Sequence, residues 1–156
     1  MAVEFKDFSI NVKTTLNETT IAWLYEAANE VTSHAKRNCS MTDDSGQLKG
    51  SYSNVVNEGK GEAKVGSPLE SAYWEEWGTG EYAAHGDGRK GWWVYSDKVK
   101  GNGGKTRTES QAKAIAASDP SLHATNGREP HYTLEKAFTT NQPKLIAQLE
   151  KKLKEL

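Results

Sequence analysis

Cysteine is scarce and long apolar runs are absent in this chain of 156 residues. Its single cysteine, Cys39, excludes an internal disulfide and a zinc site built from several cysteines. No segment approaches the roughly 20 apolar residues that a transmembrane helix needs, and the N-terminus has no basic and then apolar leader. We therefore expect a protein that stays in the cytoplasm where it is made and that contacts no membrane.

An excess of charge of one sign is also missing. The chain has 20 lysines and arginines against 21 aspartates and glutamates, and its net charge is -1. This balance creates no global basic field, so charge does not predict binding to DNA phosphates. The signs are nevertheless unevenly placed, because acidic residues concentrate between positions 58 and 87 and basic residues follow between 98 and 107. Such local polarity suits contacts between unlike protein surfaces.

Residue combinations that carry catalysis are scarce as well. His85, His123 and His131 have neither the i, i+4 spacing nor the HExxH pattern of a zinc site. Glu75 and Glu76 are expected on an extended segment, where neighbouring side chains face opposite sides and cannot act as an acid–base pair. We predict no catalytic residue, no metal and no cofactor, and hence a protein that is not an enzyme.

What the sequence does contain, first of all, is a long helical pattern. Apolar residues recur at intervals of three and four, which predicts a helix from about 16 to 38. Thr15 and Glu18 have the spacing of a capping box at its start. The apolar stripe consists of Ile21, Leu24, Ala28, Val31 and Ala35.

The spacing of apolar residues in the last part of the chain predicts a second helix with one apolar stripe. Leu145, Leu149 and Leu153 lie on one side and are expected to dock on a sheet. Pro143 precedes this stripe and is expected to break or kink the helix.

Shorter elements fill the remaining positions. They are predicted from alternating apolar and polar residues, from turn residues and from a proline at a helix start. In chain order they are a strand or extended lead-in at 3–13, a helical turn and strand at 48–56, a hairpin through 58–61 into 62–66, a helix start at 67–70, a strand at 92–96 and a short helix at 108–117. We therefore predict a single α+β domain over 1–156, with a long N-terminal and a C-terminal helix packed on a small antiparallel β-sheet with a long projecting loop.

Residues 73–95 hold four of the five tryptophans between closely spaced glycines. We expect Trp74 and Trp77 on one side, and Trp92 and Trp93 on the other, to anchor an exposed glycine-rich loop. Gly78-Thr79-Gly80 is expected to make a sharp turn in which Thr79 bonds the local backbone.

The predicted interaction surface belongs to this stretch. Its residues are Trp74, Glu76, Trp77, Gly78, Thr79, Gly80, Glu81, Tyr82, His85, Arg89, Lys90, Trp92 and Trp93.

Four short motifs occur in a fixed order along the chain. They are Ala35-Lys36-Arg37-Asn38; Ser45-Gly46-Gln47-Leu48 with Ser51; Tyr73 with Glu76-Trp77-Gly78-Thr79-Gly80; and Pro130-His131-Tyr132 with Ala137-Phe138. In this order the chain resembles the head-tail joining, or tail-completion, family of long-tailed bacteriophages. The resemblance covers roughly 15–156, and residues 97–120 have no counterpart in the family pattern and are expected to form a flexible insertion.

The resemblance implies a structural virion protein at the neck, located in the host cytoplasm before assembly. It implies that copies of the chain form a ring, commonly a hexamer. The ring would join the tail tube or tail terminator protein to the head connector or stopper protein, and DNA would pass through its lumen without specific binding. From the residues alone, a small binding or regulatory module and a small hydrolytic enzyme remain as alternatives.

Overall fold

The computed structural model describes residues 18–40, 46–98 and 104–155. These ranges contain helices and short antiparallel strand pairs, which confirms the predicted α+β class. The elements are α1 (Glu18–Asn38), α2 (Gln47–Ser51), β1 (Ser53–Asn57), β2 (Glu62–Gly66), α3 (Glu70–Trp77), β3 (Thr79–Gly80), β4 (Trp93–Ser96), α4 (Glu109–Ala116), β5 (Leu122–Thr125), β6 (Gly127–Arg128) and α5 (Thr133–Lys154).

The chain divides into two compact units. Unit 1 comprises Met1–Glu76 together with Tyr132–Leu156, and unit 2 comprises Trp77–His131. Unit 2 is therefore inserted between two parts of unit 1. The predicted N-terminal strand at 3–13 and the predicted cap at Thr15 lie outside the described residues.

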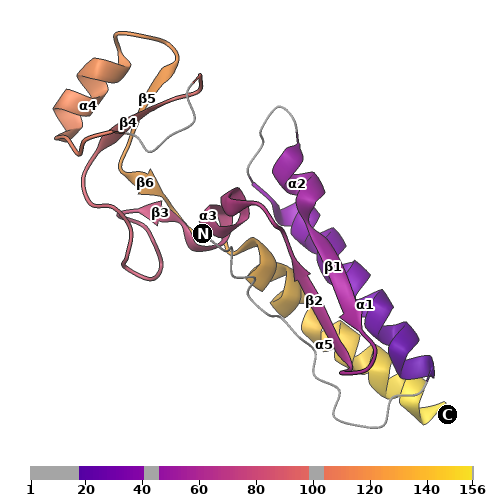
Figure 1. Cartoon of the computed structure of the whole chain (residues 1–156). Helices are drawn as coiled ribbons and strands as arrows, with labels where there is room; N and C mark the ends of the chain where they lie inside the picture. Colours follow the sequence, from indigo (N-terminus) through magenta and orange to yellow (C-terminus); the bar gives the residue numbers. More distant parts are fainter. Residues whose placement is uncertain (1–17, 41–45, 99–103, 156) are drawn as a thin grey trace. The chain divides into compact units, whose positions relative to one another are not determined.

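Helix α1 is the central element of unit 1. It contacts α5 on one side and the β1–β2 hairpin on another, as Figure 1 shows. The predicted docking of the C-terminal helix on the sheet is wrong, because α5 packs chiefly on α1 instead. The long helix and the hairpin themselves are confirmed, with β1 and β2 paired from Ser53 opposite Gly66 to Asn57 opposite Glu62.

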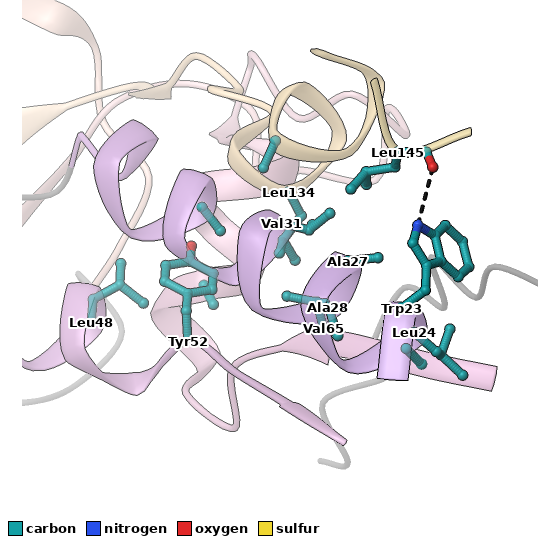
Figure 2. Close-up of a cluster of buried hydrophobic side chains, with 14 residues drawn as sticks. Trp23, Leu24, Ala27, Ala28, Val31, Leu48, Tyr52, Val65, Leu134 and Leu145 are labelled. Atoms are coloured by element: carbon teal, nitrogen blue, oxygen red, sulfur yellow. Dashed lines mark hydrogen bonds between the residues drawn. The ribbon is translucent and has the colours of Figure 1, made fainter. Parts of the chain in front are cut away.

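The core of unit 1 lies on the buried stripe of α1 (Figure 2). Trp23 and Leu24 are almost fully buried there, and the Trp23 indole donates a hydrogen bond to the Leu145 carbonyl oxygen at 3.1 Å. Leu145 is buried and Leu149 packs against the cluster, but Leu153 is 44% exposed. The predicted stripe of α5 thus contributes only its first two leucines to the core.

Helix α5 continues through Pro143, so the helix does not break there, which was one of the two predicted outcomes. A proline removes one backbone donor, and the carbonyl that loses its partner belongs to the residue four positions earlier, Thr139. Both residues are exposed. Water can therefore satisfy that carbonyl, and the cost of the proline within the helix is reduced.

The described residues of unit 2 form two short strand pairs and one helix. β3 pairs with β6, and β4 pairs with β5, both antiparallel. Helix α4 packs on the second pair and begins at Thr108, whose side chain forms a capping box with Gln111. The predicted strand at 92–96 and helix at 108–117 are confirmed, although both predictions rested on weak patterns.

Candidate functional site

Two adjacent carboxylates of α3 are buried inside unit 1. Glu75 is fully buried and Glu76 is 3% exposed. The expectation of an extended segment with a surface Glu76 is wrong, because residues 70–77 form a helix. Neighbouring side chains in a helix lie only about 100° apart around its axis, so both can enter the same side of the core.

Glu76 caps the N-terminus of α5. Its two carboxylate oxygens accept backbone hydrogen bonds from Leu134 at 2.7 Å and from Glu135 at 3.0 Å. These amides belong to the first turn of α5, where no intrahelical acceptor is available, and the positive end of the helix dipole favours a carboxylate. The residue before the helix, Tyr132, has a positive φ of 53° and provides no side-chain cap. The cap therefore comes from another helix.

Glu75 connects the ends of two further segments. Its Oε1 atom accepts hydrogen bonds from the backbone amide and hydroxyl of Ser40, at 2.6 and 2.8 Å, and from the Thr133 hydroxyl at 3.2 Å. Ser40 follows α1 and Thr133 begins α5. One buried oxygen thus fastens the end of α1 to the start of α5.

Tyr52, in the segment between α2 and β1, is buried near this junction. Its side chain is 1% exposed. Burial raises the pKa of the Tyr52 phenol well above its ordinary value, and the electrostatic influence of the nearby Cys39, Glu75 and Glu76 adds to this rise. The phenol therefore stays neutral in the folded protein. We call Ser40, Tyr52, Glu75, Glu76 and Thr133 the carboxylate junction.

Gly78 and Gly80 adopt the positive φ expected of them, 71° and 61°, but Thr79 and Gly80 form strand β3, paired with β6, in place of the predicted sharp turn. A Cβ atom on Gly78 would lie 2.6 Å from the Arg128 carbonyl oxygen, and one on Gly80 would clash with the Asn126 carbonyl oxygen. The Thr79 hydroxyl accepts a hydrogen bond from the Arg128 amide at 3.1 Å. Thr79 therefore bonds the opposite strand, β6, and not the local backbone as predicted.

The predicted loop begins at Glu81 and is closed at its base. The Glu81 carboxylate accepts hydrogen bonds from the Gly91 amide and from the Asn126 side chain, both at 3.1 Å. Within the loop, Tyr82 is 42% exposed, and His85 and Lys90 are also exposed, as predicted. The ring of His85 lies 4.6 Å from that of Trp77.

The tryptophans do not all act as anchors. Trp74 is 41% exposed on α3, so its predicted anchoring role is wrong. Trp77, Trp92 and Trp93 are half-buried within unit 2. The Arg89 guanidinium lies 5.1 Å above the ring centroid of Trp93, at the distance of a cation–π contact.

Several residues that these sites use are not marked by any sequence pattern. Ser40 and Thr133 carry no motif that marks them as partners of a carboxylate, and Tyr52 carries none that marks it as a buried neighbour of one. One signal was present: Ala72, Glu75 and Glu76 have the i, i+3, i+4 spacing of a single helix face, and all three are buried. In unit 2, Lys113 was also missed, and its ammonium lies 5.2 Å from the Trp92 ring centroid.

Within residues 18–40, 46–98 and 104–155, no three histidine, cysteine, aspartate or glutamate side chains are arranged to hold a metal ion. None of the helices in those ranges has the length and apolar content of a membrane span. No family model, curated protein or solved structure matches the chain.

Proposed function

We propose that the chain is a structural subunit of a ring at the phage head-tail interface, as its resemblance to the head-tail joining family implies. The observation that carries the proposal is that each of the four motifs places at least one residue in the interior of unit 1. Ala35, Leu48 and Ala137, from three different motifs, belong to one buried cluster. Glu76, from the remaining motif, caps the helix that contains Ala137.

This convergence supports the resemblance because it gives the four motifs one shared physical role. They are dispersed from position 35 to position 138 in the sequence, yet they join α1, α2, α3 and α5 at one place. A chance occurrence of four short patterns would not require them to contact the same core. The four motifs thus act together to stabilise the packing of these helices.

The role of Glu76 also favours a structural protein over the hydrolytic alternative. Both of its carboxylate oxygens accept backbone hydrogen bonds from α5. The oxygens of such a carboxylate are engaged in hydrogen bonds that stabilise the fold. A general acid or base, by contrast, must exchange a proton with a substrate. Glu76, which belongs to the third motif of the resemblance, therefore has a structural task.

In this proposal the chain assembles with copies of itself and contacts a head connector or stopper protein on one side. On the other side it contacts the tail tube or tail terminator protein. The near-neutral net charge of -1 suits a ring that surrounds DNA without holding it. Before assembly the subunit resides in the host cytoplasm.

The test is a deletion of the gene in the phage that carries it, examined by electron microscopy of the lysate. We expect filled heads and complete tails that remain separate, and restoration of joined particles by the intact gene supplied in trans. Antibody labelling of wild-type particles should mark the neck. Joined, infectious particles without the protein would overturn the proposal.

A further inference from the structure

The two units carry opposite net charges. Unit 2 has eight lysines and arginines against six aspartates and glutamates, and unit 1 has twelve against fifteen. Like surfaces of two copies repel each other, whereas unit 2 of one copy attracts unit 1 of another. The charge distribution therefore favours a head-to-tail contact between copies over a contact of one surface with itself.

Two arginines of unit 2 lie beside Gly104. Arg89 donates to the Gly104 carbonyl oxygen at 2.5 Å and to the Thr106 hydroxyl at 3.2 and 3.3 Å. Arg107 donates to the Lys105 carbonyl oxygen at 2.7 Å, and its Nη1 lies 4.0 Å from where a Cβ atom of Gly104 would be. Both guanidinium groups are thus held in place by neutral oxygens of three consecutive residues, 104 to 106.

Neither arginine has a carboxylate partner in the part of the chain that the structure describes. The adjacent residues 99–103, with the sequence VKGNG, contain no acidic residue that could supply one. The arginine pair therefore presents positive charge that its surroundings do not neutralise. Because each guanidinium is already oriented, it loses little further entropy when it binds an anionic group.

The surroundings of the pair have the composition of an interface. Trp93 lies under Arg89, and Trp92 is bridged to Arg107 through backbone hydrogen bonds of 2.7 and 3.2 Å. Tryptophan and arginine are the residue types enriched among the contacts that dominate binding energy between proteins. The pair is accordingly suited to a partner that presents a carboxylate beside aromatic rings.

Helix α3 of unit 1 presents such a surface. Tyr73 and Trp74 are 37% and 41% exposed, and Glu70 precedes them at i−3 and i−4, so the three share one exposed helix face. Glu70 forms no ion pair within the described ranges. We call these three residues the α3 face.

We propose that Arg89 and Arg107 of one copy bind the Glu70 carboxylate on the α3 face of a second copy, with Tyr73 and Trp74 packed beside the tryptophans of unit 2. This inference rests on the proposed ring and names the contact that builds it. The contact joins two different surfaces, so its repetition leads to a closed ring or an open helix.

Nucleic acid is the competing ligand for the arginine pair, and the number of phosphates that the pair could neutralise argues against it. Proteins that hold duplex DNA at physiological salt neutralise roughly 6 to 10 phosphates, and each contact contributes about −0.9 to the salt slope. The arginine pair would neutralise about two phosphates, which is too few for stable binding. In a protein interface, by contrast, one desolvated arginine–carboxylate pair can be decisive.

The experiment measures self-association by sedimentation velocity over a range of protein concentrations. Arg107→Glu and Glu70→Arg should each weaken association of the full chain about thirtyfold or more. An equimolar mixture of the two variants should regain it, because each variant then supplies the charge that the other lacks. Arg89 is left intact, since its hydrogen bonds also organise unit 2.

Two control variants make the same charge changes elsewhere. Lys98→Glu changes an exposed lysine of unit 2, and Glu18→Arg changes an acidic residue in the first turn of α1, as Glu70 is in the first turn of α3. Both should associate like the wild-type chain, and thermal unfolding should confirm that all variants fold.

Three outcomes would overturn the proposed contact. The first is a wild-type chain that stays monomeric at every concentration. The second is wild-type association by both charge variants, which would leave the ring proposal intact and place its contact elsewhere. The third is a monomer that shifts a duplex oligonucleotide and loses this shift with Arg107→Glu, which would make phosphate the ligand. Failure of the ring proposal itself is detected separately, by joined particles in the deletion phage.

Discussion

Units 1 and 2 are held together by different physical means. Unit 1 has a cluster of 14 buried hydrophobic residues, which Figure 2 shows around α1 and α5. Among the described residues of unit 2, Ala112 alone is a buried hydrophobic residue. The free energy of unfolding of unit 1 should therefore depend mainly on apolar volume removed from water.

Unit 2 depends instead on close backbone contacts and polar interactions. Gly78, Gly80 and Gly127 all adopt positive φ, and a Cβ atom on any of them would collide with backbone atoms of the paired strand. Arg89 adds hydrogen bonds to Gly104 and Thr106. The comparison shows that one chain can combine a unit that is sensitive to side-chain volume with a unit that is sensitive to backbone conformation.

The largest effect is expected from Gly78→Val in unit 2. A β-branched residue at φ 71° costs about 1 to 3 kcal/mol, and a Cβ atom 2.6 Å from the Arg128 carbonyl oxygen adds a similar amount. We expect a total loss of roughly 2 to 6 kcal/mol, which should appear as faster amide exchange throughout unit 2. Unit 1 should retain its protection.

Gly86→Val is the matched control for this variant. Gly86 also has a positive φ, of 72°, but a Cβ atom there meets nothing within 4 Å. Gly86→Val should therefore lower the free energy of unfolding only by the backbone strain at positive φ, about 1 to 3 kcal/mol. Equal destabilisation by both variants would show that the close approach to β6 does not hold unit 2.

Leu24→Ala is the corresponding variant in unit 1. Leu24 is fully buried, so truncation removes apolar contacts and leaves a cavity that costs about 2 to 5 kcal/mol. Denaturant unfolding should report this loss, with Val55→Ala, at a site 70% exposed, as a nearly neutral control. An unchanged midpoint for Leu24→Ala would remove α1 from the core.

Glu76→Gln should have the next largest effect. A glutamine amide keeps one acceptor oxygen but replaces the other by a donor, so Leu134 or Glu135 of α5 loses its partner. We expect a loss of about 1.5 to 3 kcal/mol, since hydrogen bonds to charged groups have this magnitude. Glu150→Gln, at an exposed glutamate of α5, serves as the control. Equal stability of the two variants in thermal unfolding would contradict the buried cap.

The smallest effect concerns Tyr52 and alkaline pH. Burial raises its pKa in the folded state, so above the ordinary value of 10.0 the unfolded chain loses this proton before the folded chain does. The contribution of Tyr52 to the free energy of unfolding is thus fully present below pH 10.0. It falls as the pH rises above this value, by up to about 1.4 kcal/mol per pH unit. Tyr52→Phe should remove this slope, whereas Tyr82→Phe, at an exposed tyrosine, should not. The same alkaline slope in wild type and Tyr52→Phe would refute the assignment.

Local patterns were sufficient to predict the elements whose cause is local. The three- and four-residue spacing of apolar residues predicted α1, and turn chemistry at 58–61 predicted the hairpin of β1 and β2. The glycines at 78 and 80 predicted the positive φ at these two positions. In each case the deciding interactions lie within a few residues of one another, so the sequence by itself determined them.

Only the tertiary structure decided the carboxylate junction. Glu75 and Glu76 bond residues of α5 that are 58 or 59 positions away in the sequence, and no local pattern specifies such partners. The same holds for Pro143, whose helix continues because the affected residue, Thr139, faces solvent, and for Trp74, which the packing of α3 leaves exposed. The type of a residue determines what its side chain can bind. The burial of that side chain depends on which distant segments the fold brings around it.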